Sequence, residues 1–408
     1  MFILTLCANT LNMKSLKKIA LLLSIPITLG FEVNAQNVNI PDANFKAYLV
    51  GSTAINTNAD AEIQINEASS FTGLLDCHNM DISDLTGIEA FTALTMLYCH
   101  MNTLSSLDVS SNTVLTDLNC SINSLSSIDV SNNTALTYLN CVGNSLSSID
   151  VSNNTALTYL NCVGNSLSSL DVSNNTALTY LDCQSNSLSG LDVSNNTALT
   201  LLLCGNNSLS SLDVSNNTVL TYFSCKNNSL SSLDISNNTA LILLNCSYNS
   251  LSNLDVTNNV VLTKIRCNCN VLASLNMANG NNTIIGIFDA TCNNYLTCIQ
   301  VDDVAYSSKT WSFIDHEASF STQCATIGIK NLESIIKLSL YPNPASSVVY
   351  IESAIKINII QILNLTGQKV IDQRQNLEEI DISKLSKGIY TVRIFTDLGD
   401  VVKKLIKE

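Results

Sequence analysis

Proline is almost missing from this sequence. The four prolines are Pro26, Pro41, Pro342 and Pro344, so residues 42–341 contain none. Because proline has no backbone N–H, its absence favours ladders in which every residue donates a hydrogen bond. Charged residues are also scarce, at 13% of the chain, and the formal net charge is −14. A nucleic-acid partner is therefore excluded, since phosphates require a surface rich in lysine and arginine.

Histidine and basic residues are too few to indicate an enzyme. The three histidines lie far apart, and no nucleophile–base pattern recurs beside them: His78, His100 and His316. A polysaccharide lyase on a parallel solenoid would need a basic group in its groove, and the repeated region has only three basic residues: Lys226, Lys264 and Arg266. A calcium-dependent glycan-active enzyme is a disfavoured alternative.

The first 35 residues predict a secretory signal. A basic stretch at residues 14–18 precedes an apolar run over residues 19–29, and Val33 and Ala35 provide small residues before a cleavage site. Met13 is the expected start. The apolar run is too short for a bilayer and no other segment is long enough, so we expect an exported mature protein without a transmembrane segment.

A 21-residue repeat fills the middle of the chain. Four columns recur at this spacing: leucine from Leu94 to Leu262, cysteine from Cys99 to Cys267, asparagine from Asn102 to Asn270, and aspartate from Asp108 to Asp255. Cys77 is one residue out of step with the cysteine column. A unit of this size cannot bury its apolar side alone, so it must stack on its neighbours.

Each repeat contains two segments with the alternation of a β-strand. Leu160 and Cys162 flank one polar residue, and Leu170 and Val172 flank another. Parallel strands of neighbouring repeats lie about 4.8 Å apart, so identical side chains form columns. We expect a mainly β parallel solenoid, with a dry interior and with asparagines that bond the backbone of the next coil at left-handed bends.

These columns resemble the leucine-rich repeat family. Its pattern LxxLxLxxNxL appears here with cysteine in one leucine position: Leu157, Leu160, Cys162, Asn165 and Leu167. The resemblance covers residues 91–280 through about nine units and implies a bacterial subclass with a short, nested repeat. Because the repeat has no helical segment, we expect a flatter and more evenly two-sided solenoid.

Two non-repeating segments are expected to cap the solenoid. In the first, residues 36–90, Asp42 is placed as the N-cap of a short helix over residues 40–49, with Phe45, Tyr48 and Leu49 on one face. The second, residues 281–326, carries Trp311. Such caps are needed because a bare terminal coil exposes core and strand edges.

The last segment, residues 327–408, combines a linker with a different kind of domain. Four motifs follow in order at residues 341–345, 362–370, 386–393 and 403–407. Together they resemble the C-terminal sorting domain of the type IX (Por) secretion system. That resemblance implies export through the type IX machinery to the outer-membrane cell surface or the medium. About seven short strands separated by turns predict an Ig-like β-sandwich.

Fifteen cysteines in an exported chain would ordinarily indicate a disulfide framework. Nine of them share one core column, where we expect free, inert thiols, although neighbouring coils bring Cα atoms within disulfide range. Cys298 and Cys324 lie off this column in the C-terminal cap, and we predict that they form a disulfide. The pairing of Cys269 and Cys292 stays open.

Two acidic features raise the question of calcium. The aspartate column sets like charges about 4.8 Å apart, and we expect carboxylates turned to solvent rather than a line of cations. A loop before residue 70 resembles an EF-hand loop, with candidate Ca²⁺ ligands Asn56, Asn58, Asp60, Glu62 and Glu67. It departs from that pattern at neutral Asn56 and at Ala61 in the glycine position. The alternative is a cap loop shaped by Asx turns.

The outward strand positions are the remaining candidate site. One column contains tyrosines and the next contains amides and a carboxylate: Tyr138, Tyr159, Tyr180 and Tyr222 beside Asn140, Asn161, Asp182 and Asn245. An aromatic and amide face suits recognition of an extracellular protein or glycan. Alternatively, the tyrosines stack only to stabilise the sheet. We interpret the chain as an exported, non-enzymatic binding or adhesion protein that requires no cofactor, with a passive surface stalk as the alternative.

Overall fold

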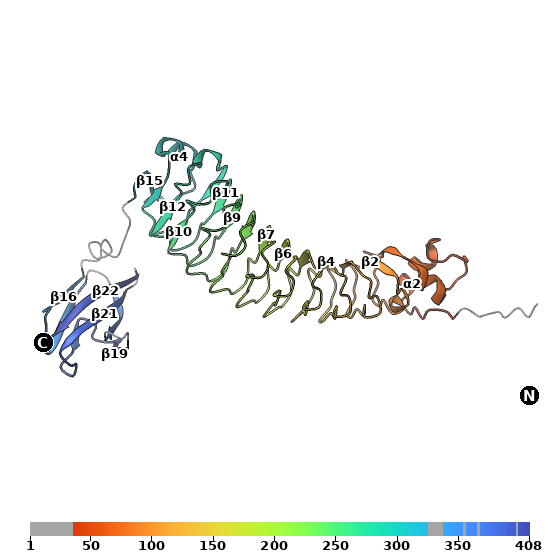
Figure 1. Ribbon diagram of the computed structural model, residues 1–408, viewed down its shortest axis with the longest axis horizontal. Coiled ribbons are helices and arrows are strands. Elements are labelled where there is room, and N and C mark those ends of the chain that lie inside the picture. The colour runs from red at the N-terminus through yellow and green to blue at the C-terminus, as the bar shows by residue number, and fades with distance from the viewer. Residues whose placement is uncertain (1–35, 325–337, 354–355, 365–367, 397–398) are drawn as a thin grey trace, which may run out of the picture.

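A computed structural model describes residues 36–324, 338–353, 356–364, 368–396 and 399–408. These residues form an arc-shaped solenoid and a separate β-domain (Figure 1). The expected signal at residues 1–35 and the linker at residues 327–337 lie outside the described residues.

The solenoid is built on one long parallel sheet. Its eleven strands follow the order of the chain and are β1 (Gly73–Asp76), β2 (Leu94–Tyr98), β3 (Asp117–Asn119), β4 (Tyr138–Asn140), β5 (Tyr159–Asn161), β6 (Tyr180–Asp182), β7 (Leu201–Leu203), β8 (Tyr222–Ser224), β9 (Leu243–Asn245), β11 (Lys264–Arg266) and β13 (Ile287–Asp289). Equivalent residues of successive repeats are in register, as Leu139, Leu160 and Leu181 are. The predicted stacking of like on like is confirmed.

The other side of the coils differs from the expected one. Residues 170–172 form no strand. Among the described residues, the second parallel sheet lies near the C-terminal cap, with strands β10 (Asn253–Asp255), β12 (Ser274–Asn276), β14 (Cys298–Gln300) and β15 (Ser319–Ser321), and an isolated parallel bridge joins Asp108 to Asp129 in earlier coils. Asp171 Oδ1 accepts a hydrogen bond from Ser173 N at 2.9 Å, an Asx turn that diverts the backbone from a ladder. The expectation of an evenly two-sided solenoid is therefore wrong.

The long sheet lines the concave side of the arc (Figure 1). On this side backbone hydrogen bonds hold neighbouring coils together. For example, Cys162 N donates to Asp182 O at 2.9 Å. On the convex side side-chain amides provide links, such as the 3.2 Å bond from Asn174 Nδ2 to Ser152 O. Because side chains span a longer gap than a direct backbone bond, the convex side can be wider and the rod curves toward the sheet.

The interior is a continuous apolar core. The leucine, cysteine and valine columns are buried throughout the repeats. Cys77 is a free, buried thiol that lies next to Cys99 in the same column, although the two are 22 residues apart. Each thiol lies near the backbone of the next coil, as the 3.6 Å contact from Cys141 Sγ to Asn161 O shows. Burial raises the pKa of these thiols, to about 12 for Cys120, and so disfavours the reactive thiolate; the inertness of the column stays a prediction.

Two asparagine ladders tie the coils together at the bends. Asn165 Nδ2 donates to Cys141 O at 3.0 Å in the preceding coil and to Cys162 O at 3.1 Å in its own. A second ladder uses the fully buried column from Asn112 to Asn259. The amide function is confirmed, but the left-handed backbone lies one residue before the first ladder, for example at Gly164 with φ 67°.

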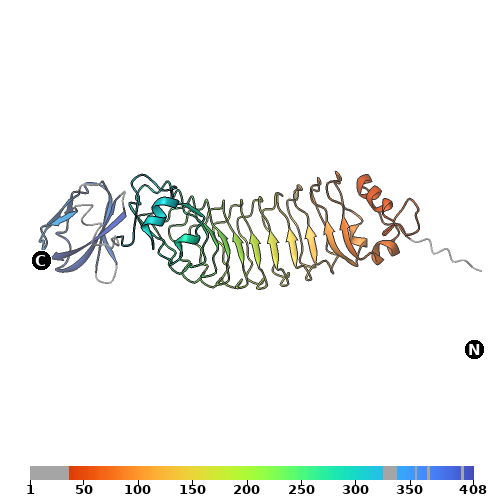
Figure 2. The ribbon, with the colours of Figure 1, turned by 90° about the horizontal axis from the view of Figure 1, so that it is seen from above.

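Both ends of the solenoid are capped (Figure 2). The N-terminal cap contains α2 (Ala43–Gly51), α3 (Ile65–Ser70) and the 3₁₀ turn η1 (Ile88–Ala90). Asp42 caps α2 as predicted, with Oδ1 accepting from Asn44 N and Phe45 N. Phe45 and Leu49 are fully buried on the core, so the helix closes the first coil.

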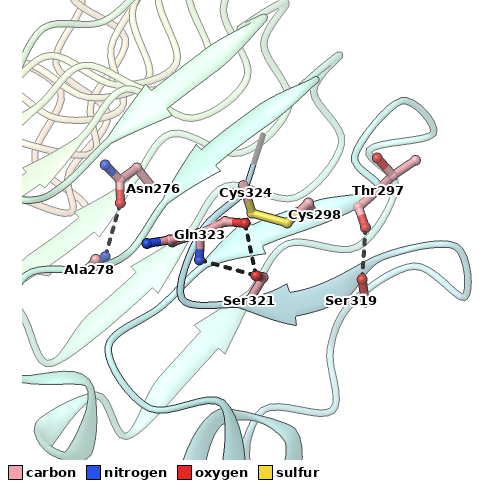
Figure 3. The surroundings of a disulfide bond; sticks show 8 residues. All are labelled: Asn276, Ala278, Thr297, Cys298, Ser319, Ser321, Gln323 and Cys324. Carbon is pink, nitrogen blue, oxygen red and sulfur yellow. Dashed lines mark hydrogen bonds between the residues drawn. A yellow bond between two sulfur atoms is a disulfide. The ribbon is translucent and has the colours of Figure 1, made fainter. Parts of the chain in front are cut away.

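The C-terminal cap contains η2 (Asn282–Ile284) and α4 (Val304–Thr310). Trp311 stacks on Phe288, with ring centroids 4.4 Å apart, and covers the last coil. The predicted disulfide between Cys298 and Cys324 is present, with Cα atoms 5.8 Å apart. It joins β14 to the segment after β15 (Figure 3), so the covalent bond closes the cap.

The C-terminal domain consists of two antiparallel sheets. Their strands are β16 (Ser339–Tyr341), β17 (Val348–Glu352) and β20 (Glu379–Asp381) in one, and β18 (Ile357–Leu363), β19 (Lys369–Gln373), β21 (Gly388–Thr396) and β22 (Gly399–Lys407) in the other. A separate core includes Val349, Ile360 and Val392. The expected small β-sandwich is confirmed.

Candidate binding face

The concave sheet places three tyrosines in direct contact. Tyr138, Tyr159 and Tyr180 are in register on β4, β5 and β6. Their ring centroids are 4.4 and 4.2 Å apart and their planes are within 16° of parallel. The side chains point outward because the intervening residue of each strand faces the core. We call these three residues the tyrosine stack.

Tyr222 shares the column but does not join the stack. Leu201 occupies the intervening coil, between Tyr180 and Tyr222 in the register. Tyr222 is 43% exposed and is followed by Leu243. The column therefore forms one amphipathic strip from Tyr138 to Leu243, in which the tyrosine stack occupies one end.

The next outward column supplies polar groups to the stack. Asn161 Nδ2 lies 3.3 Å from the Tyr159 hydroxyl, and Asn140 makes the equivalent contact to Tyr138 at 3.5 Å. The amide oxygens accept from the backbone two residues later, as Asn161 Oδ1 does from Val163 N at 3.3 Å. These amides thus orient the tyrosine hydroxyls.

Asp182 continues the amide column as a buried carboxylate. Its Oδ1 accepts from Gln184 N at 3.2 Å and from Gln184 Nε2 at 3.1 Å. Burial raises the pKa of Asp182, and the bonds from Gln184 oppose that rise. Burial also raises the pKa of Tyr138 and Tyr180, and contact with the Tyr159 hydroxyl adds to both shifts. The hydroxyls of Tyr138 and Tyr180 consequently stay neutral at physiological pH.

Stacking determines what the three tyrosines can contact. Both faces of the Tyr159 ring are covered by its neighbours. A ligand therefore meets ring edges and hydroxyls over most of the stack, rather than flat aromatic faces. Such a surface combines apolar area with directional hydrogen bonds at low entropic cost, the combination common in protein interfaces.

The candidate calcium ligands lie in the N-terminal cap and are engaged by protein donors. Glu67 Oε1 accepts from Thr57 N at 2.8 Å and from the Thr57 hydroxyl at 2.9 Å, and its Oε2 accepts from Gln64 N at 3.0 Å. Asp60 Oδ1 accepts from Glu62 N at 2.7 Å. These bonds lower the pKa of both carboxyl groups.

The remaining candidate ligands are likewise turned to protein partners. Glu62 pairs with Lys46 Nζ at 2.7 Å. Asn58 Oδ1 accepts from Asp60 N at 2.9 Å, whereas the buried Asn56 Oδ1 has no protein partner. In the described part of the chain no three acidic, histidine or cysteine side chains converge on a metal position. Calcium binding stays a prediction, and isothermal titration of the mature protein at millimolar Ca²⁺ tests it.

Two features near the ends of the sheet were not predicted from the sequence. At the N-terminal end, His78 and His100 stack with centroids 4.6 Å apart, and His78 Nδ1 lies 2.6 Å from Asp76 Oδ1. Their 22-residue separation equals that of Cys77 and Cys99, so the displaced cysteine could have revealed the pair.

The second feature is a pocket at the C-terminal end of the sheet. It has a volume of about 240 Å³, and its lining includes Arg266, Phe288, Trp311 and Phe313. Phe313 is 63% exposed. The sequence placed Trp311 in the cap, but only the paired strands β11 and β13 bring Arg266 to the same place.

Two family models match this chain. The model of a secretion system C-terminal sorting domain matches residues 339–408, and that of the EndoS leucine-rich repeat domain of an endo-beta-N-acetylglucosaminidase matches residues 58–196. The chain is a bacterial leucine-rich repeat protein with a type IX secretion sorting domain. Its tail marks it for export to the cell surface or for secretion.

Solved structures agree with this assignment. The leucine-rich repeat protein is similar to the functional domain of InlJ from Listeria monocytogenes, whose structure is described as including a cysteine ladder. The identity is 26% and the TM-score 0.53, covering 92% of this chain and 100% of that one. The protein is thus internalin-like in architecture.

Two curated relatives match shorter segments. Internalin J of Listeria monocytogenes is 45% identical over 72 residues, or 18% of this chain. Beta-agarase D of Zobellia galactanivorans is 31% identical over 102 residues, or 25% of this chain. The matched segments span only 8% and 20% of those two proteins. Within the described residues of the leucine-rich repeat protein, no helix has the length and apolarity to cross a membrane.

Proposed function

We propose that this exported protein binds an extracellular protein through the concave sheet, with Tyr138, Asn140, Tyr159, Asn161, Tyr180, Asp182 and Tyr222 in the contact surface. The observation that carries this proposal is the tyrosine stack, which continues into a strip of leucine and tyrosine flanked by polar side chains. An apolar centre with a polar border is the anatomy of a protein interface.

A glycan ligand is the second candidate, because amides beside aromatic rings also suit sugars. The stacking geometry favours protein, since a sugar ring packs on an open aromatic face and the faces of Tyr159 are occupied. Tyr222 has leucine neighbours in place of stacking partners, and it would provide the sugar contact.

We propose a binding or adhesion role rather than catalysis. The leucine-rich repeat model matches residues 58–196, and the similar functional domain of InlJ is described as including a cysteine ladder, a feature that in this chain belongs to the core. On the concave face the carboxylate of Asp182 is bound by Gln184, so no free acid–base pair accompanies the tyrosine stack. Sustained turnover of any glycan by the purified mature protein would overturn this assignment.

The test compares binding by the wild-type protein and two triple variants. In Y138F/Y159F/Y180F the rings remain and the hydroxyls are lost, whereas in Y138A/Y159A/Y180A the stack is removed. Y295A serves as a control, because Tyr295 is 43% exposed and lies in the C-terminal cap. Each protein is assayed against extracellular proteins and against a glycan array, and circular dichroism checks its fold.

We expect the alanine variant to bind its protein ligand with an affinity at least tenfold lower than that of the wild type. The phenylalanine variant should lose less affinity, and Y295A should bind as the wild type does. Glycan binding abolished by Y222A alone would replace the proposal with its rival. If all variants bound every ligand as the wild type does, the tyrosine stack would have no binding role, and the passive surface stalk would be the remaining interpretation.

A further inference from the structure

Two thiols lie outside both the buried column and the cap disulfide. Among the described residues, Cys269 is a half-buried free cysteine and Cys292 an exposed one, whereas the other free thiols are buried. Strands β11 and β13 pair with a 23-residue offset, as Lys264 and Ile287 show. The same offset relates Cys269 to Cys292, so both occupy one position in adjacent coils.

The backbone holds the two positions side by side. Cys269 N donates to Thr291 O at 2.8 Å across the coils. Both cysteines have left-handed backbones, with φ 52° and 59°, so their Cβ atoms leave the chain in the same direction. Neighbouring parallel strands are about 4.8 Å apart, which lies within the Cα separation of disulfides. The two thiols also interact, because Cys269 raises the pKa of Cys292.

We propose that Cys269 and Cys292 form a second disulfide on the exported protein. The required oxidant is an external disulfide, either that of a dithiol oxidoreductase or of a small molecule. Cys292, the exposed member, attacks one sulfur of this disulfide as a thiolate, forms a mixed disulfide and releases one thiolate. Cys269 then attacks the Cys292 sulfur as a thiolate and displaces the second. Two protein thiols lose two electrons and two protons, and the external disulfide becomes two thiols.

The surroundings favour the oxidised form. Hydrogen bonding to Cys269 and burial raise the pKa of Cys292 to about 11, and the charge of Asp315 adds to the shift. Because the surroundings do not stabilise the Cys292 thiolate, they add little to the stability of the reduced form relative to the disulfide. An oxidising compartment therefore preserves the disulfide. Cys292 N also donates to Asp315 Oδ1 at 2.8 Å, which fixes the loop. The disulfide joins the last two coils before the Cys298–Cys324 closure.

The test maps disulfides in mature protein secreted into an oxidising compartment. Native protein is alkylated with iodoacetamide before and after mild reduction, then digested with Asp-N, which cuts before Asp289 and so separates the two cysteines. We expect neither thiol to be labelled before reduction and a disulfide-linked fragment in the digest. After reduction we expect both to be labelled. Cys162 is the buried control and should react only after denaturation.

The variants C269S and C292S distinguish a disulfide between the two cysteines from thiols that iodoacetamide merely cannot reach. Each should expose its former partner to alkylation in unreduced native protein. Quantitative labelling of both cysteines in unreduced wild-type protein would overturn the proposal. So would digestion that releases the two fragments unlinked. The result is independent of any ligand, so it stands or falls separately from the proposed function.

Discussion

The two sides of each coil follow different rules. On the convex side the same Asp-Val-Ser-Asn-Asn segment recurs almost unchanged, whereas on the concave side the outward column reads Tyr138, Tyr159, Tyr180, Leu201 and Tyr222. On the convex side the aspartate and both asparagines of the segment bond backbone groups of their own or the preceding coil, as Asp171, Asn174 and Asn175 do. On the concave side of the described coils, the column of tyrosines and leucines makes no bond to the backbone of the neighbouring coils through its side chains, and its residues differ from coil to coil.

Hydrogen bonding explains the uniformity of the convex side. Asp171 Oδ1 caps a turn, and Asn175 Nδ2 donates to both Val151 O and Asn154 O at 2.9 Å. A different residue at Asn175 would remove the bonds that join the two coils and leave these carbonyls with only their backbone donors, Asn154 N and Leu157 N, and a different residue at Asp171 would remove the acceptor of the turn. The comparison teaches that uniform columns carry structure, and that the varied column is where specificity can reside.

The largest effect is expected at the buried asparagine ladder. Asn154→Ala removes bonds to Val130 O at 2.9 Å and Asn133 O at 2.8 Å. Both carbonyls keep a backbone donor, Asn133 N and Leu136 N. The cost is therefore two hydrogen bonds of about 0.5–1.5 kcal/mol each plus the cavity left by the amide, and we expect a loss of roughly 2–4 kcal/mol in the free energy of unfolding, measured with urea. Asn153→Ala, at the exposed neighbour, should change it by no more than about 0.5 kcal/mol. Equal losses would refute the distinction.

A smaller effect is expected in the cysteine column. Cys162→Leu adds volume to a fully buried position and should lower the free energy of unfolding by about 1–3 kcal/mol. Tyr159→Phe, at an outward position of the same coil, keeps the stack and should change the free energy of unfolding by no more than about 0.5 kcal/mol. If Cys162→Leu unfolded at the wild-type urea concentration, the column would be loosely packed.

A pH-dependent effect is expected at Asp182. Burial raises the pKa of Asp182 above its ordinary value of 3.8, so folding disfavours the ionised form. The free energy of unfolding therefore decreases as pH rises from the unfolded pKa through the folded one. Asp182→Asn, which copies Asn140 and Asn161, should raise the Tm at pH 7 and lose that advantage below pH 3.8. A Tm gain of the same size across this range would exclude titration as its cause.

The smallest effect is expected at the exposed aspartate column. Bonds from the Ser173 hydroxyl and N–H lower the pKa of Asp171, so its contribution is present above the unfolded pKa and is lost as pH falls through the folded one. Asp171→Ala should lower the Tm slightly at pH 7, while Asp171→Asn keeps the acceptor and the Tm. If the asparagine variant behaved as the alanine variant does, charge rather than turn geometry would be responsible.

The sequence predicted the sheet and the core columns because identical letters at one spacing define a register, and it predicted the Cys298–Cys324 bond because both cysteines lie off the cysteine column in the same cap. It could not predict the convex side, since the alternation of Leu170, Asp171 and Val172 fits both a strand and an Asx turn, and the turn prevailed. Likewise the tyrosine column was readable, but the closure of the Tyr159 ring faces depends on side-chain rotamers, which periodicity does not specify.

The in-register stacking also makes the rod a ruler. Each coil bonds only to the coil before it and the coil after it. One further copy of residues 157–177 would therefore fit between existing copies without disturbing either cap. Such a duplication would extend the reach of the molecule by about 4.8 Å for every 21 residues gained. Length is therefore a property that this architecture can change in fixed steps, independently of its stability at either end.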